Sequence, residues 1–241
     1  MGPARSRAVI RGTALAAVAV LLSSCAKEGI SPQGQDVHQL YLVIMILAVP
    51  VFVAVEALLL WCVFRYRKRD DTPAKQTVGG GRSLGVFFAI PAVIVATLFP
   101  FGENTLMQIQ QRETPQVQIR VEGFQWEWTF LYLNEGIFVS GKTLVRPAVM
   151  ELPVDEPVEI QLTSRDVIHS FFVPAFRIKQ DAVPGMSIRV WFQPTKPGEY
   201  ELGCAELCGL GHYRMRAVVT VHTQEDYDRW MAERSRSVAQ R

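Results

Sequence analysis

The sequence predicts two membrane-spanning helices followed by an all-β domain, and three observations lead to this fold class. Two apolar runs, at residues 40–64 and 84–101, are each long enough to cross the hydrocarbon core of a bilayer. From residue 117 onward, apolar and polar residues alternate in short segments, as they do in half-buried strands. Turn signals rich in glycine and proline separate these segments, which is typical of a β-sandwich or barrel.

Residues 1–24 have the features of a signal peptide. Three arginines among the first 11 residues form a positive n-region, and residues 14–22 form a short apolar h-region. Cys25 follows Leu-Ser-Ser, a sequence that resembles a bacterial lipobox, so we expect cleavage before Cys25 and attachment of lipid to it. The alternative is an ordinary signal peptide with an incidental cysteine. In both cases the mature N-terminus lies outside the cytoplasm.

Residues 25–112 are predicted to form a helical hairpin in the membrane. A basic cluster at residues 65–69 directly follows the first apolar run, which places the connection between the runs on the cytoplasmic side. The β domain is therefore expected outside the cytoplasm, whereas a buried hairpin of a soluble protein is the alternative. Glu56 lies within the first run, where an ionisable residue indicates either a functional role or a structural one near the cytoplasmic face.

Residues 113–223 are predicted to form the β domain, and residues 224–241 a C-terminal helix and basic tail. The clearest strands are expected at residues 117–121, 158–162, 188–192 and 218–221. The helix is expected from Gln224 to Glu233. The net charge of +2 gives no indication of a nucleic-acid partner.

One short loop gathers two thiolates, an imidazole and a thioether. Its sequence is Cys204-Ala205-Glu206-Leu207-Cys208-Gly209-Leu210-Gly211-His212-Tyr213-Arg214-Met215. Soft sulfur ligands together with imidazole favour copper over magnesium, calcium or manganese. Two cysteines can bridge two metals. His212 could complete the ligand set of one metal, and the upstream His169 that of the other. Met215 would then be a weak ligand to one copper, and the backbone carbonyl of Glu206 could serve the other.

Other interpretations of this loop stay open at the level of sequence. A zinc site would use cysteine and histidine but has little use for Met215. A disulfide between Cys204 and Cys208 could form in an oxidising compartment. A mononuclear blue-copper site needs only one cysteine, so the second thiolate favours a dinuclear centre. The remaining cysteines, Cys25 and Cys62, lie in or beside apolar segments and do not indicate a disulfide framework.

Three segments of the chain carry a resemblance to a known family. They are the cysteine-rich loop, the run Asp166-Val167-Ile168-His169-Ser170-Phe171-Phe172-Val173-Pro174 with the following residues 179–185, and the aromatic stretch Gly123-Phe124-Gln125-Trp126-Glu127-Trp128. Together they resemble subunit II of bacterial haem-copper cytochrome c oxidases, over about residues 40–230. The resemblance implies a cupredoxin-like Greek-key barrel that carries CuA, the mixed-valence dinuclear copper centre of that family.

The resemblance further implies an electron-entry subunit in the bacterial inner membrane. Cytochrome c would deliver electrons through Trp126 to CuA, and haem in subunit I would then receive them for the reduction of oxygen to water. The Glu206 side chain would bind a magnesium ion shared with subunit I, and subunit III would complete the assembly. Asp166 would lie near the docking face, where a carboxylate attracts a basic cytochrome. The alternatives are packing for Trp126, a solvated charge for Glu206 and a turn residue for Asp166.

This chain departs from the family pattern at several positions. Leu84 and Phe87 stand where many relatives carry Glu and Trp near a proton pathway, which puts proton uptake in doubt. Because the chain contains no C-x-x-C-H motif, it is not expected to hold haem or to reduce oxygen itself. The main rival is a CuA subunit of a nitrogen-oxide reductase. A copper carrier would not need the hairpin, and quinol oxidase relatives lack the copper ligands.

Overall fold

The computed structural model describes residues 29–68, 73, 79–111, 113–141 and 146–239. The chain divides into two compact units, one formed by residues 39–111 and the other by residues 1–38 together with 112–241. The predicted signal peptide and Cys25 lie outside the described residues. Each unit is described by itself below.

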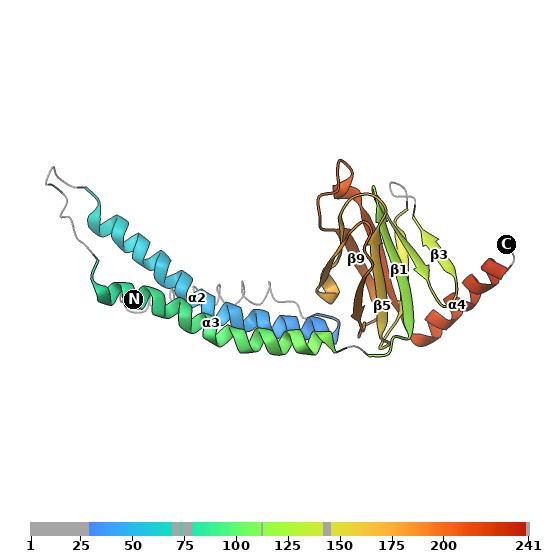
Figure 1. Cartoon of the computed structure of the whole chain (residues 1–241), viewed down its shortest axis with the longest axis horizontal. Helices are drawn as coiled ribbons and strands as arrows, with labels where there is room; N and C mark the ends of the chain where they lie inside the picture. The colour runs from blue at the N-terminus through green and yellow to red at the C-terminus, as the bar shows by residue number, and fades with distance from the viewer. Residues whose placement is uncertain (1–28, 69–72, 74–78, 112, 142–145, 240–241) are drawn as a thin grey trace, which may run out of the picture. The chain divides into compact units, whose positions relative to one another are not determined.

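Two long helices make up the apolar part of the chain (Figure 1). They are α2 (Pro32–Tyr66) and α3 (Gly81–Gln110), with mean hydropathies of 2.8 and 2.3 in their most apolar windows. Neither window is buried within the described chain, so the apolar side chains are available to lipid. This confirms the expected pair of helices capable of spanning a membrane. Both helices extend beyond the predicted apolar runs, and α2 begins at a proline, whose fixed φ suits a first helical position.

Two five-stranded sheets face each other in the second unit (Figure 1). The first sheet has the order β3-β2-β1-β5-β8, with β1 (Val117–Phe124), β2 (Glu127–Tyr132), β3 (Ile137–Ser140), β5 (Val158–Ser164) and β8 (Ile188–Phe192). The second has the order β4-β10-β9-β6-β7, with β4 (Ala148–Pro153), β6 (His169–Val173), β7 (Ile178–Ala182), β9 (Gly198–Cys204) and β10 (Arg216–His222). Parallel pairs, β1 with β5 and β4 with β10, occur in both sheets among antiparallel ones. The cupredoxin-like fold class is therefore confirmed.

Alternating side chains build the core between the sheets. In β5, the side chains of Val158, Ile160 and Leu162 are fully buried, whereas the residues between them are partly exposed. Burial of each such aliphatic side chain stabilises the folded state by about 1.5–3 kcal/mol relative to leaving it exposed. The core formed in this way is a rigid scaffold for the loops at the ends of the strands.

The four strands expected from alternation are confirmed as β1, β5, β8 and β10. The sequence pattern did not indicate β2 or β6, because their buried residues follow one another without alternation. In β2, Trp128, Thr129 and Phe130 are buried in succession, and in β6 only Phe172 among five residues is partly exposed. Strands covered on both faces lose the period of two on which the prediction depends.

The C-terminal helix α4 (Gln224–Ala239) is longer than the helix expected from residue 224 to 233. Thr223 begins it as an N-cap, because its Oγ1 accepts a hydrogen bond from the Asp226 N–H at 3.3 Å. Ion pairs from Arg229 to Glu225 and Asp226, spaced four and three residues apart, support the first turns.

A short segment at the start of the first described helix, residues 29–34, is bound to the β domain, and we call it the N-terminal strap. The Ile30 N–H donates to the Ala175 carbonyl at 3.0 Å, and the Ile30 carbonyl accepts from the N–H and hydroxyl of Thr195 at 2.9 and 2.8 Å. Ser31 is fully buried, and its hydroxyl donates to the Phe176 carbonyl at 3.2 Å. Residues 29–38 thus belong to the β-domain unit, whereas the sequence predicts them as part of the hairpin of residues 25–112.

Replacing Ser31 by alanine is expected to loosen the strap. The Ser31 hydroxyl also accepts a hydrogen bond from the Gly34 N–H at 3.0 Å, so the substitution removes two hydrogen bonds at a buried position. Leaving such groups unpaired costs about 1–3 kcal/mol. Thermal unfolding of the full chain in detergent, followed by near-ultraviolet circular dichroism, should therefore show a lower melting temperature. The exposed Ser237→Ala substitution is the control, and equal melting of the two variants would contradict the role of the strap.

Candidate metal centre

The cysteine-rich loop connects β9 to β10 and is held beside the start of β6. Cys204 is the last residue of β9, and Met215 directly precedes β10. The Cys204 N–H donates to the Met215 carbonyl at 3.0 Å, which closes the base of the loop. The Ala205 N–H donates to the Ser170 carbonyl at 3.0 Å and fixes the loop to β6. These backbone bonds bring His169, at the start of β6, next to the loop.

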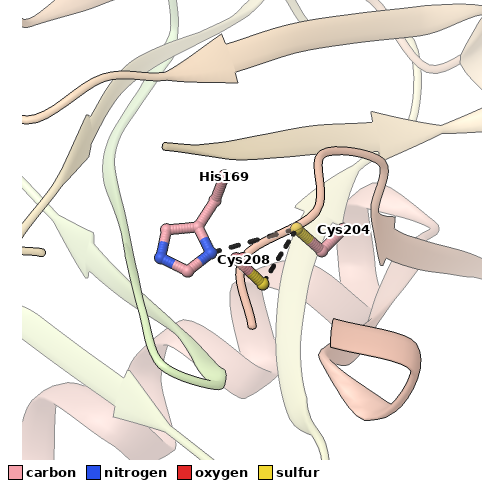
Figure 2. Close-up of side chains that lie close together, drawn as sticks. All are labelled: His169, Cys204 and Cys208. Carbon is pink, nitrogen blue, oxygen red and sulfur yellow. Dashed lines mark hydrogen bonds between the residues drawn. The ribbon is translucent and has the colours of Figure 1, made fainter. Parts of the chain in front are cut away.

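The sulfurs of Cys204 and Cys208 lie close together beside His169, and we call this group and its neighbours the loop cluster (Figure 2). Their Sγ atoms are 3.8 Å apart, which is too far for a disulfide bond of about 2.05 Å. The His169 Nδ1 lies 3.9 Å from the Cys204 Sγ. Ligand atoms of these three residues all lie within 4.8 Å of one another, so they could share a metal ion.

Three further predicted groups complete the cluster. The His212 Nδ1 lies 3.6 Å from the Cys208 Sγ, and the Met215 Sδ lies 3.8 Å from the same sulfur. The Glu206 carbonyl oxygen lies 3.2 Å from the Cys204 Sγ. Metal–ligand bonds of about 2.0–2.3 Å, the range for zinc, allow two ligand atoms of one ion to lie just under 4 Å apart. The spacing therefore fits metal binding, and the soft donors suit copper.

The cluster is symmetric in its chemistry. Each sulfur has its own imidazole nitrogen and its own weaker donor: His169 and the Glu206 carbonyl stand beside Cys204, and His212 and Met215 stand beside Cys208. Such a donor set offers two places for a metal with the sulfurs shared between them. His169 and Met215 are fully buried and Cys208 is nearly so, which limits access of water to the centre.

Asp166 orients one of these imidazoles. Its Oδ1 accepts a hydrogen bond from the His169 Nε2 at 2.8 Å, and its Oδ2 accepts one from the Gln125 N–H at 2.8 Å. A proton on Nε2 leaves Nδ1 free to face Cys204, as a metal-bound histidine requires. Burial alone raises the pKa of Asp166, but the hydrogen bonds from His169 and from backbone N–H groups outweigh it and lower the pKa. The family resemblance implies that Asp166 lies near a docking face. Its position three residues before His169 was the signal for this second role.

The two thiols differ in acidity. Burial raises the pKa of Cys204, but hydrogen bonding to His169 and to nearby backbone groups outweighs it and lowers that pKa to about 6. For Cys208, burial and the negative charge of Cys204 both raise the pKa. The metal-free pair therefore favours a single thiolate, and a bound cation is what allows the second thiol to lose its proton.

Trp126 lies against the cysteine-rich loop. Its indole Nε1 donates to the Cys208 carbonyl at 3.0 Å, and the Gln125 Nε2 donates to the same oxygen at 2.9 Å. Trp126 lies in the turn between β1 and β2 and is partly buried, whereas Trp128 is fully buried in the core. The two rings therefore have different environments. Sequence reasoning missed Gln125, because its amide reaches the Cys208 carbonyl, 83 residues away, only in the folded chain.

Two predicted residues, Glu56 and Cys25, are not part of this cluster, and Glu206 contributes its carbonyl to it. The side chain of Glu206 is exposed, as are its neighbours Leu207 at 78% and Leu210 at 91%. Glu56 lies in the helical unit, and its role stays a prediction. Cys25 is outside the described residues.

Two family models match this chain. The model described as "Cytochrome C oxidase subunit II, periplasmic domain" matches residues 117–222, which contain all the clustered groups. The model described as "Cytochrome C oxidase subunit II, transmembrane domain" matches residues 21–101. Together with the two apolar helices, these matches make the chain an inner-membrane protein with a periplasmic C-terminal domain.

Curated relatives carry the same description. Cytochrome c oxidase subunit 2 of Cereibacter sphaeroides is 30% identical, over 84% of this chain and 77% of the relative. The protein of the same name from Synechocystis sp. is 29% identical, over 84% of this chain and 73% of the relative. A crystal structure of the periplasmic domain of subunit II of cytochrome oxidase from Bradyrhizobium japonicum aligns with a TM-score of 0.49 and 28% identity, covering 53% of this chain and 99% of that domain. The chain belongs to the cytochrome c oxidase subunit II family.

Proposed function

We propose that this chain is the electron-entry subunit of a cytochrome c oxidase and that its loop cluster holds the dinuclear copper centre CuA. The observation that carries the proposal is the pair of cysteine sulfurs 3.8 Å apart, each with its own imidazole nitrogen at 3.9 or 3.6 Å. The family members are oxidase subunits, so the chain belongs to an oxidoreductase complex.

Each clustered residue has a role in this proposal. The thiolates of Cys204 and Cys208 would be shared by the two coppers, and His169 and His212 would each hold one of them. Met215 and the Glu206 carbonyl would be the weaker ligands. When bound, the copper pair accepts and releases one electron at a time. The protein keeps the donors in place through the hydrogen bonds at the base of the loop and through Asp166, so little rearrangement accompanies the change of charge.

The remaining roles concern partners. Cytochrome c delivers electrons at Trp126, whose indole joins the surface to the Cys208 carbonyl. Subunit I receives them at its haem, and subunit III completes the complex. The exposed carboxylate of Glu206 is free to bind a magnesium ion together with subunit I. Lipid attachment at Cys25 stays a prediction, which the intact mass of the mature chain would decide.

A nitrogen-oxide reductase subunit is the alternative function, and the match of residues 21–101 to the transmembrane domain of the oxidase subunit favours the oxidase. The complex purified through a tag on this chain decides between them. We expect two coppers in this chain in addition to the copper of the haem-copper subunit, an electron paramagnetic resonance spectrum with one electron shared by two copper nuclei, and oxygen consumption with reduced cytochrome c. Reduction of a nitrogen oxide without oxygen consumption would favour the alternative. A single-nucleus spectrum or bound zinc would refute the dinuclear centre.

Replacing either bridging cysteine by serine should abolish the shared-electron spectrum. A serine hydroxyl stays protonated near neutral pH and is a poor ligand for copper, so Cys204→Ser and Cys208→Ser should reduce the copper content from two to about one or fewer per chain. Elemental analysis and paramagnetic resonance measure both quantities. The control is Cys62→Ser in α2, which should keep two coppers. A two-copper spectrum that survives in Cys204→Ser would contradict the bridging role.

Replacing Asp166 by alanine should weaken metal binding. Loss of a carboxylate that orients a histidine ligand typically lowers metal affinity about 10–100-fold. Competition between the full chain and a copper(I) chelator measures this affinity. Asp228→Ala is the matched control, because Asp228 is an exposed carboxylate on α4 that accepts a hydrogen bond from Gln224. Equal affinities of the two variants would show that Asp166 does not support the metal centre.

A further inference from the structure

We propose that Gly211 is a positioning residue for electron entry, because the absence of a side chain at this position lets the Trp126 indole lie directly on the metal-binding loop. This inference rests on the proposed function of the chain as an electron-entry subunit. It adds that the contact between tryptophan and loop depends on a residue that is neither a metal ligand nor part of the tryptophan itself.

The space beside Gly211 is filled by the indole ring. A Cβ atom at Gly211 would lie 2.4 Å from Cδ2, 2.6 Å from Cγ and 2.7 Å from Cε3 of Trp126. Real Cβ atoms essentially never approach another heavy atom within 3.0 Å. All three atoms belong to a rigid ring, which can move away only as a whole by rotation of the side chain or a shift of the backbone. Any residue other than glycine at position 211 therefore displaces Trp126 or the loop.

A hydrogen bond at the edge of the indole ring holds the ring against the loop. The indole Nε1 donates to the Cys208 carbonyl at 3.0 Å, so the ring is held by its N–H and by its face at the same time. Gly209 also borders the ring: a Cβ there would lie 3.5 Å from Nε1, and its φ of 110° favours glycine. Gln125 donates to the same carbonyl at 2.9 Å and adds a second fixed contact at this point.

This arrangement gives electrons a short connection into the centre. The Cys208 carbonyl belongs to the residue whose sulfur is a proposed bridge, so a single hydrogen bond links the indole to the covalent frame of a ligand. One electron leaves the reduced cytochrome, which is thereby oxidised, and reduces the copper pair by tunnelling past the indole. The proton stays on Nε1, and Trp126 is unchanged at the end. A displaced ring loses the hydrogen bond and lengthens the path.

The decisive comparison is Gly211→Ala against Gly203→Ala in the full chain. Gly203 lies on β9 just before Cys204, and a Cβ there would meet no atom within 4 Å. The position of the indole is measured by nuclear magnetic resonance on the metal-free chain in detergent. The five tryptophans of the chain give five indole N–H resonances. The resonance that disappears in Trp126→Phe belongs to Trp126. We expect Gly211→Ala to shift this resonance and to speed its hydrogen exchange, and Gly203→Ala to change neither.

The rate is read in the assembled oxidase, by flash-induced electron transfer from cytochrome c to copper. Misplacement of a reacting group by about 1 Å can cost about 10²-fold in rate, so we expect Gly211→Ala to slow copper reduction by roughly ten- to a hundredfold. Copper content and the paramagnetic resonance spectrum should stay as in the wild type, because no ligand is altered. A normal rate, or an unchanged indole resonance, in Gly211→Ala would overturn the positioning role.

A second pair of variants covers the case in which Gly211→Ala disrupts the loop. Trp126→Phe removes the N–H donor without adding bulk next to Gly211, and it should slow copper reduction to a similar degree. Since both changes act through the same contact, Gly211→Ala combined with Trp126→Phe should be no slower than the slower single variant. If the double variant instead slowed copper reduction by the product of the two single effects, the inference would be overturned. Failure of the wild type to bind two coppers or to accept electrons would instead refute the proposed function, and the inference with it.

Discussion

The antiparallel pairing of β6 with β9 is the interaction on which the proposed metal centre depends. It joins Phe171 to Cys204 and Phe172 to Gly203, and through it a histidine and a cysteine that are 35 residues apart reach the same place. Both strands belong to the second sheet, whose inner face is buried against the first sheet, so the pairing cannot shift by one residue without turning buried side chains outward. The core thereby fixes the distance between two donor atoms that no local sequence could fix.

Rigidity at the centre comes from several weak constraints rather than from one strong one. Backbone hydrogen bonds close the base of the loop, Asp166 fixes the tautomer of His169, and two donors converge on the Cys208 carbonyl. These constraints act on different ligand residues: Cys204 and Met215, His169, and Cys208. A metal that changes its charge repeatedly benefits from such a frame, because donors that are already in place do not have to reorganise.

The sequence alone predicted the donor set and the fold class, because both are encoded locally. Closely spaced soft ligands identify the loop from Cys204 to Met215, and alternation identifies strands such as β1 and β5. The contacts of Asp166, Gln125 and Gly211 were not predicted, since their partners are brought close only by the tertiary fold. The N-terminal strap escaped prediction for the same reason: Ser31 and its acceptor Phe176 are separated by 145 residues.

The strap also has a consequence for the order of assembly. Its residues are made before the two apolar helices, whereas the carbonyl and N–H groups that bind it, at Ala175, Phe176 and Thr195, are made after them. The strap can therefore dock only when the chain has crossed the bilayer and returned, so that both of its ends stand on the same side. A chain inserted with a single crossing would hold the strap and its hydrogen-bond partners on opposite sides of the bilayer, so these hydrogen bonds report the two-crossing topology.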